Sequence, residues 1–420
     1  MSSDAAHIDM TAAFGNIAIA NTSASPTDAQ GAFARLPDHL VATHILRSEY
    51  FDDPADLARL PAVSRAMRDA VAETGLRLKE LDEKRAVELG CVSAVQSMQR
   101  QGRLSRQELL CQAAARSGQL AELKVLRADG WPWDTSTCWA AARGGHLEVL
   151  QWARTNGCSW DVDTCSRAAE GGHLEVLQWL RANGAPWDER AIFFAAQKGH
   201  EAMVQALIEL GADINKAMND GMTPLYIAAE KGHDAVVRAL IELGAHVNKA
   251  ENNGMTPLLI AAQHAHEAMV RALIEAGADI NKAGDTGVTP LYIVALQGHE
   301  AIVRALMEFG SDDNKAENNG VTPLLIAAEK GHEAVVRALI EAGADVNKAT
   351  DNGWTPLLIA AHNGHEAVVR ALIQAGADVN KATDTGMTPP YMAAQKGHTA
   401  IVQILGDAVL HEEPNENQPV

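Results

Sequence analysis

Apolar residues recur along this chain at helical spacing. Late in the sequence they fall between polar residues at i, i+1, i+4 and i+5, as Val368, Val369, Leu372 and Ile373. This spacing puts the four side chains on one face of an α-helix, so it predicts a short helix with a single apolar stripe. Gly376 follows at the point where a left-handed residue would end that helix.

A second short helix is expected just before this one. Thr355-Pro356 is a favourable helix start, because the first helical turn has no partner for the N–H group that proline lacks. The preceding Asp-Asn-Gly at 351–353 is typical of a turn. Ala360 and Ala361 are small, so the two helices can approach closely. The unit therefore consists of turn, helix, turn and helix.

This unit recurs at a fixed interval, which a Gly-His pair marks. Its histidines are spaced by 27 residues in the earlier part and by 33 in the later part, at His146, His173, His200, His233, His299, His332, His365 and His398. His-Ala-His at 264–266 keeps the interval with Ala265 in place of glycine. Two such short helices have too little interior to fold alone, so neighbouring units must cover their apolar faces. The predicted fold is all-α, a solenoid of stacked helix-turn-helix units.

The recurring motifs are Gly-x-Thr-Pro-Leu, Ala-Ala, Gly-His and Gly-Ala-Asp-Val-Asn, and they closely resemble ankyrin repeats. The resemblance covers residues from about 84 to 405. Units of 33 residues make up 218–405 and begin near 218, 251, 284, 317, 350 and 383. The stretch 84–217 resembles a shortened repeat of 27 residues, and 406–420 is expected to be a mobile acidic and polar tail.

One position departs from the family throughout the longer units. Ankyrin repeats usually carry a histidine after Thr-Pro-Leu, whereas this chain has Tyr226, Leu259, Tyr292, Leu325 and Leu358 there. The hydrogen bonds that this histidine makes between repeats in the family are therefore not implied for this chain.

The front of the chain has a different character. Residues 1–33 are rich in alanine, serine, threonine and glycine without sustained periodicity, and we expect them to be disordered. Residues 34–75 contain Leu-Pro-Asp-His-Leu at 36–40, Ile-Leu at 45–46 and Asp-Leu-Ala-Arg-Leu at 56–60. This segment resembles an F-box, a small helical module that binds a Skp-type adaptor of cullin-based ubiquitin ligases. The resemblance implies seven adaptor-facing and core positions: Leu36, Pro37, Leu40, Ile45, Leu57, Leu60 and Val63. The alternative is an amphipathic helical cap that covers the end of the solenoid.

Charge and composition exclude several classes of function. A net charge of −19 opposes nucleic-acid binding, since no strong basic patch is visible. No apolar run approaches the roughly 18–20 residues that span a bilayer, so no membrane association is expected. The five cysteines lack paired CxxC spacing, which favours free thiols over a metal site. We therefore expect a protein of the cytoplasm, the nucleus or both, without metal or cofactor.

Cysteine and tryptophan also occupy repeated positions. Cys111, Cys138 and Cys165 are spaced by 27 residues and are expected to be small core residues on short helices. The tryptophans form two sets, one of Trp133, Trp160 and Trp187 and one of Trp152 and Trp179. Residues at fixed repeat positions favour packing over a ligand cage.

Two sets of positions vary between otherwise similar units and are candidates for partner binding. Just before each Thr-Pro stand Met222, Met255, Val288, Val321, Trp354 and Met387. Just before each Gly-His position stand Lys231, His264, Gln297, Lys330, Asn363 and Lys396. If these residues face solvent on the concave side, they form an apolar line with a polar rim that suits a protein partner. The alternative is that the line packs partly between adjacent turns and that its variation is neutral.

Two further expectations concern charge. Arg271 and Glu275 are spaced i, i+4, as are their counterparts except where Gln374 replaces the acid, so weak ion pairs along the second helices are predicted. Asp313 stands where neighbouring units have Ile280 or Val346. Because an unpaired buried charge is costly, this loop is expected to open outward and to form a weak joint near 294–313.

The pattern favours a binding protein over an enzyme. Most histidines belong to the repeat, and no acid, base and nucleophile converge off its register. The leading hypothesis is a non-catalytic substrate receptor of a cullin-RING ubiquitin ligase, with its target held on the repeats. The alternative is an ankyrin scaffold or inhibitor with no link to ubiquitin ligation; the protein partner is not identifiable from the sequence in either case.

Overall fold

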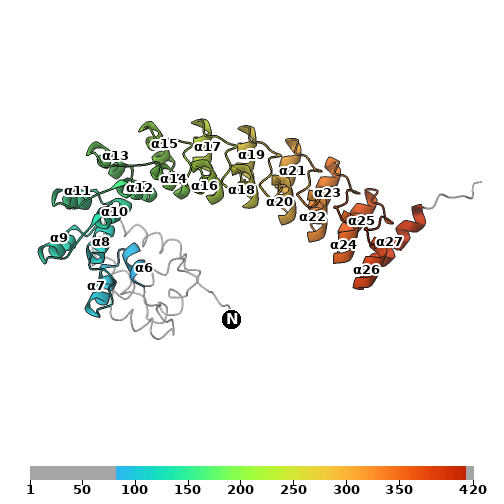
Figure 1. Ribbon diagram of the computed structural model, residues 1–420, viewed down its shortest axis with the longest axis horizontal. Coiled ribbons are helices and arrows are strands. Elements are labelled where there is room, and N and C mark those ends of the chain that lie inside the picture. The colour runs from blue at the N-terminus through green and yellow to red at the C-terminus, as the bar shows by residue number, and fades with distance from the viewer. Residues whose placement is uncertain (1–81, 413–420) are drawn as a thin grey trace, which may run out of the picture. The chain divides into compact units, whose positions relative to one another are not determined.

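The computed structural model describes residues 82–412, and within these residues all the regular structure is helical. The chain divides into two compact units, Met1–Ser159 and Trp160–Val420, which are described separately. In the described part of the first unit the helices are α6 Glu83–Glu88, α7 Val92–Arg100, α8 Leu109–Arg116, α9 Leu120–Ala128, α10 Thr135–Gly144 and α11 Leu147–Thr155 (Figure 1).

The second unit continues the same alternation of helices. Its first four helices are α12 Val162–Gly171, α13 Leu174–Ala182, α14 Arg190–Lys198 and α15 Glu201–Glu209. The helices that follow are α16 Pro224–Lys231, α17 Asp234–Glu242, α18 Pro257–Gln263, α19 Glu267–Glu275, α20 Pro290–Gln297, α21 Glu300–Glu308, α22 Pro323–Lys330, α23 Glu333–Ala342, α24 Pro356–Asn363, α25 Glu366–Gln374, α26 Pro389–Lys396 and α27 Thr399–Glu412. From α14 onward the even-numbered helices form one row and the odd-numbered helices the other (Figure 1). The predicted solenoid of stacked helix pairs is confirmed.

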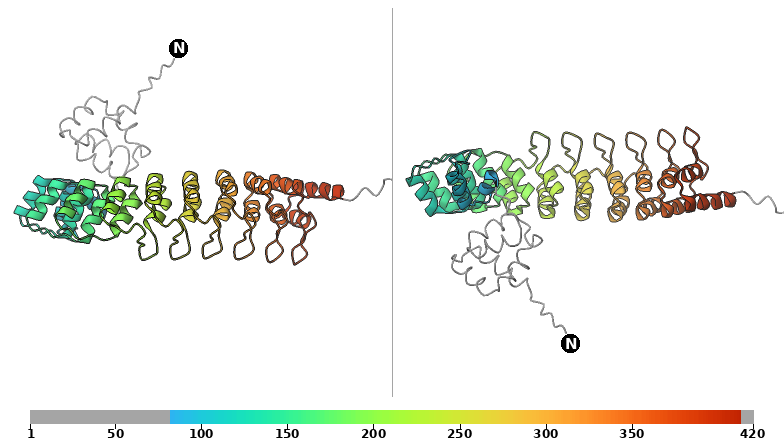
Figure 2. Two further views of the ribbon diagram at one scale, coloured as in Figure 1. Left: turned by 90° about the horizontal axis from the view of Figure 1, so that it is seen from above. Right: turned by 90° about the horizontal axis from the view of Figure 1, so that it is seen from below.

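Each 33-residue repeat begins with a short β-turn hairpin that projects to the same side of the second unit (Figure 2). The N–H of Thr350 donates to the carbonyl of Trp354 at 2.9 Å, and Gly353, with φ of +82°, donates to the carbonyl of Thr350 at 2.9 Å. A side chain is strained at such a φ, which explains why glycine closes every one of these turns. The same bond joins Met218 to Met222 at 2.9 Å and Glu251 to Met255 at 3.0 Å.

Threonine and proline start the first helix of these repeats, as their sequence predicts. Pro323 is the first residue of α22, and the N–H of Leu325 donates to the Thr322 hydroxyl oxygen at 3.2 Å. Thr223, Thr256, Thr289 and Thr355 cap their helices in the same way. Thr388 makes no such side-chain bond in the last repeat.

Aspartate caps the first helix in two of the shorter repeats. In the first unit Asp134 accepts a hydrogen bond from the N–H of Ser136 at 2.9 Å. In the second unit Asp161 accepts one from the N–H of Asp163 at 3.0 Å, and the Thr164 hydroxyl accepts one from the N–H of Asp161 in return. These repeats therefore begin their helices without the projecting hairpin.

The arginines of the second helices make ion pairs, but not with the predicted partners. Arg271 contacts Glu267 at 3.4 Å on its own helix and Glu308 of the next repeat at 3.2 Å, instead of Glu275. Arg304 repeats the pattern with Glu300 and Glu341, both at 2.9 Å. The acid at i+4 is thus paired with the arginine of the preceding repeat, so these exposed pairs join repeats.

The prediction that the Asp313 loop opens outward is wrong. Asp313 is half-buried, as Ile280 and Val346 are at the same position. The N–H of Asp312 donates to the Asn281 side chain at 2.8 Å, which matches the bond from Asp345 to Asn314 at 3.0 Å in the next repeat. Asn314 donates its side-chain amide to the Asp313 carboxylate at 2.7 Å, so this carboxylate has a partner where it lies.

We predict that Thr322→Ala lowers the free energy of unfolding by about 1 kcal/mol, because it removes a helix-capping acceptor. Thr388→Ala is the matched control, since Thr388 occupies the same position without a capping bond, and it should cost at most a few tenths of a kcal/mol by comparison. Urea denaturation followed by circular dichroism measures both. Equal losses in the two variants would show that the capping bond is not the stabilising feature.

Candidate protein-binding surface

The residues that precede Thr-Pro lie at the base of the hairpins in the second unit. Met222, Met255, Val288, Val321, Trp354 and Met387 are all half-buried. Their backbone carbonyls close the hairpins, as described for Trp354, so the side chains recur at one position beside the first helices. Each therefore offers part of its surface to solvent. The Met255 sulfur lies beside the next hairpin, since a Cβ at Gly284 would stand 3.8 Å from it.

Trp354 is the largest side chain of this apolar row and is held by a specific contact. Its ring lies edge-on to the imidazole of His362, with centroids 5.5 Å apart and planes at 79°. Burial lowers the pKa of His362, and the nearby charges of Lys396 and His398 lower it further. A neutral imidazole at neutral pH therefore supports the Trp354 ring, and sequence reasoning missed this role although His362 adjoins the predicted Asn363.

The residues that precede the Gly-His position form a second row at the ends of the first helices. All six are exposed: Lys231, His264, Gln297, Lys330, Asn363 and Lys396. Two of them bond to the preceding repeat, since Gln297 donates to the carbonyl of Gln263 at 2.8 Å and Asn363 to that of Glu329 at 2.9 Å. Lys231 and Lys330 contact the adjacent Glu230 and Glu329, both at 2.7 Å.

Tyrosine at the position of the family's usual histidine makes a contact of its own. The Tyr226 hydroxyl donates to the Glu251 carboxylate of the next repeat at 3.0 Å. Burial, followed by the charge and hydrogen bond of Glu251, raises the pKa of Tyr226 far above its usual value. The first joint of the long repeats thus retains a polar contact at this position, although its donor is a phenol.

The tryptophans of the short repeats pack against each other. In the first unit Trp133 and Trp152 lie edge to face at 5.7 Å, and the Arg127 guanidinium lies 4.3 Å from the Trp133 ring. In the second unit Trp160 and Trp179 repeat the contact at 5.8 Å. Trp187 lies against the Arg181 guanidinium instead, 5.0 Å from its ring. The other four tryptophans of the two sets meet in pairs, which agrees with the packing interpretation.

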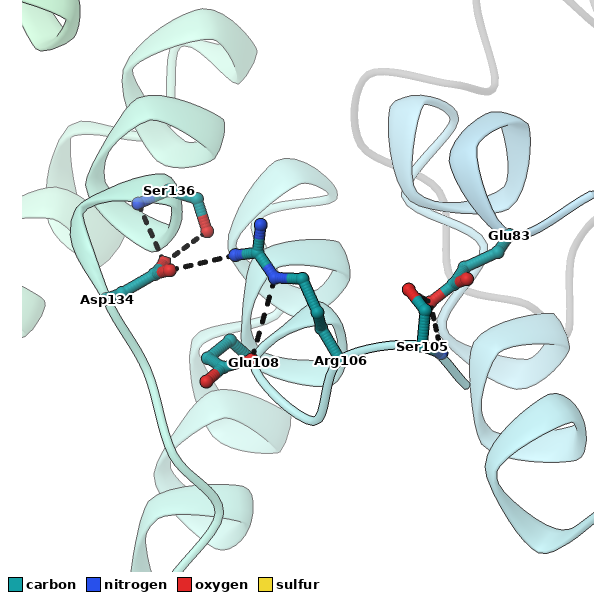
Figure 3. A network of polar contacts seen from close by, with 6 residues as sticks. All are labelled: Glu83, Ser105, Arg106, Glu108, Asp134 and Ser136. Atoms are coloured by element: carbon teal, nitrogen blue, oxygen red, sulfur yellow. Dashed lines mark hydrogen bonds and ion pairs between the residues drawn. The ribbon is translucent and has the colours of Figure 1, made fainter. Parts of the chain in front are cut away.

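Polar side chains tie together successive repeats of the first unit (Figure 3). Glu83 accepts hydrogen bonds from the backbone N–H and the hydroxyl of Ser105 at 2.9 and 2.8 Å. Arg106 contacts Asp134, the cap of α10, at 2.9 Å and Glu108 at 3.8 Å. Capping and ion pairing satisfy these charges locally, so the network is structural.

The repeated cysteines lie in the core, as predicted. Cys111, Cys138 and Cys165 are fully buried on α8, α10 and α12. Burial raises the pKa of Cys111 and of Cys165 to about 11, so both are neutral thiols at neutral pH. Neutral buried thiols are poor nucleophiles, which agrees with a packing role.

Residues 82–412 contain no group of three or more histidine, cysteine or acidic side chains placed to hold a metal ion. No helix in this part of the chain is both long and apolar enough to cross a membrane. The predicted adaptor-binding positions Leu36, Pro37, Leu40, Ile45, Leu57, Leu60 and Val63 lie outside the described residues.

Comparison with known families decides what these repeats are. Five overlapping segments match the family model of ankyrin repeats (3 copies), at residues 137–218, 165–251, 192–284, 277–350 and 345–417. The chain belongs to the ankyrin-repeat family. No curated protein matches the sequence. Ankyrin repeats serve as protein-protein interaction modules, and the two rows described above lie on the repeats that the family model covers.

One electrostatic feature of these ankyrin repeats is testable by pH. Burial, followed by the nearby charge of Asp312, raises the pKa of Asp313 in the folded protein. The folded state therefore favours the neutral acid, and the ionised form lowers stability at neutral pH. We predict that Asp313→Asn stabilises the protein at pH 7 and that the gain disappears below about pH 4, where aspartate is also protonated in the unfolded chain.

The gain is measured as the difference in urea unfolding midpoint between the Asp313→Asn variant and the native protein, from pH 3.5 to 8. Asp345→Asn is the control, because Asp345 is exposed in the equivalent loop of the next repeat and keeps a side-chain acceptor for Asn347. A gain of equal size for both variants, or one that does not change with pH, would contradict the assignment to Asp313.

Proposed function

We propose that the second unit holds a protein partner across the apolar row at the hairpin bases and the exposed row at the first-helix ends. The observation that supports this is that both rows vary from repeat to repeat, while Thr-Pro, the buried leucine of the second helix and the histidine before that helix recur in every long repeat. Variation confined to accessible positions of a constant framework is what a binding surface on a repeat protein requires.

Trp354 is the proposed anchor of this surface. A large aromatic side chain held in place by packing loses little conformational freedom on binding, and such residues often contribute most to affinity. His362 holds the Trp354 ring from one side. The methionines of the same row add flexible apolar surface that can adapt to a partner.

The partner surface is testable with two triple variants of the full chain. Lys231→Ala, Lys330→Ala and Lys396→Ala remove three exposed charges from the first-helix row, and Arg238→Ala, Arg337→Ala and Arg370→Ala remove three from the second-helix face. Partners enriched by affinity capture from cell extract would be purified and their Kd measured by calorimetry. We expect the lysine triple variant to weaken binding at least tenfold, and the single variant Trp354→Ala to do the same. The arginine triple variant should weaken binding less than twofold. Equal weakening by both triple variants would contradict the proposed surface.

We further propose that residues 34–75 act as an F-box, so that the captured protein is presented to a cullin-RING ubiquitin ligase in the cytoplasm or nucleus. The support is the sequence resemblance at Leu36, Pro37 and Leu40 and at the later apolar positions. The competing proposal is a scaffold or inhibitor in which these residues cap the repeats.

A Skp-type adaptor separates the two proposals. Full-length protein and a Leu40→Asp, Leu60→Asp variant would be incubated with purified adaptor and analysed by size-exclusion chromatography. Co-elution of the native chain alone is expected for an F-box, whereas no co-elution of either protein would favour the scaffold. Circular dichroism confirms that the ankyrin repeats of the variant remain folded.

A further inference from the structure

The histidine of the Gly-His pair joins most repeats to the one before. Its Nε2 donates to a backbone carbonyl near the end of the preceding first helix, at 2.9 to 3.1 Å. Among the histidines that make this bond are His146, His200, His233, His332, His365 and His398. Each is half-buried, so the bond is partly shielded from water.

His266 and His299 are the exceptions in the long repeats. The equivalent acceptors would be the carbonyls of Glu230 and Gln263, and neither imidazole makes a side-chain hydrogen bond to the described residues. These two histidines stand at the two joints of one repeat, residues 251–283. This repeat therefore lacks the histidine bond to both of its neighbours.

Ala265 explains why His299 does not bond to the preceding repeat. Elsewhere this position is glycine with positive φ, and a Cβ there would lie 2.7 Å from the ring of His332 at Gly298 and 2.6 Å from that of His365 at Gly331. Ala265 adopts the same left-handed conformation, with φ of +59°, and is the one described non-glycine residue to do so. Its methyl group therefore occupies the space that the imidazole of His299 needs.

An exposed amide side chain still bonds across this joint. Gln297 donates to the carbonyl of Gln263 at 2.8 Å, as Asn363 donates to that of Glu329 at the joint where His365 also donates. A long exposed side chain loses rotamer freedom in such a bond and competes with water for it. This amide bond does not replace the half-buried histidine bond that the joint lacks.

The other joint differs in the residue that lies beside its histidine. His266 stacks on His264, with centroids 6.0 Å apart and planes at 22°. The residue equivalent to His264 is Lys231, Lys330 or Lys396 in three other long repeats, and the following histidine of each makes the bond.

We propose that the repeat of residues 251–283 is a built-in weak joint, at which the ankyrin array opens locally more readily than at its other long repeats. Three features coincide there: a left-handed alanine, two missing histidine bonds and a pair of stacked imidazoles. Because each repeat is stabilised chiefly by its neighbours, weakening both joints of one repeat lowers the cost of separating α18 and α19 from the helices beside them. The array flexes at this repeat without unfolding as a whole.

Hydrogen exchange of the full chain, read by mass spectrometry, tests this proposal. Amides of α18 and α20 should exchange at least fivefold faster than those of α22 and α24, which flank an intact joint closed by His365. Ala265→Gly should slow exchange in α18 and α20 roughly tenfold, because it relieves the backbone and readmits the imidazole. Gly331→Ala is the matched reverse change and should speed exchange in α22 and α24.

A double variant isolates the imidazole from the backbone. Ala265→Gly alone should lower the logarithm of the exchange rate in α18 and α20. When it is combined with His299→Leu, less than half of this decrease should remain, because the glycine is restored but the imidazole donor is missing. Equal exchange of α18 and α22 in the native chain would overturn the proposal. So would an Ala265→Gly variant that exchanges as the native chain does, provided that circular dichroism shows unchanged helix content.

Discussion

The fold depends on the inability of any single repeat to bury its own apolar surface. Helices such as α16, with 8 residues, and α17, with 9, are too short to be stable alone in water. They persist because Leu225 and Leu240 are fully buried in the stack, and because specific groups cap most of the first helices. Threonine or aspartate closes the start, and a left-handed glycine closes the end of most first helices. Stability is therefore a sum over joints.

The same constraint explains how far the sequence predicts the structure. Helix starts, glycine turns and buried cysteines each depend on residues within one repeat, so periodicity places them correctly. The partner of Arg271 depends instead on how one repeat is offset from the next, and only the structure shows that Glu308 takes the place expected for Glu275. Asp313 was misjudged for a related reason, since Asn281 of the preceding repeat and Asn314 hold its loop in the common conformation.

The proposed surface likewise combines features that one repeat determines and features that depend on contacts between segments. Repeat comparison found which positions vary, but it could not show that the apolar row is half-buried while the polar row is exposed. It also could not show that Gln297 and Asn363 are partly engaged by the preceding repeat, or that His362 supports Trp354. These contacts run between side chains from different segments. The proposed surface therefore has fewer unengaged side chains than the repeat comparison alone indicates.

The likeness of the repeats creates a problem of alignment for any partner. A ligand that touched only the constant framework would find several equivalent positions, each displaced from the next by one repeat, and would occupy all of them. Trp354 occurs once in its row, among methionines and valines. A partner that has a pocket for this indole is held at a single position. One side chain thus fixes the register of a partner on a surface whose other positions repeat.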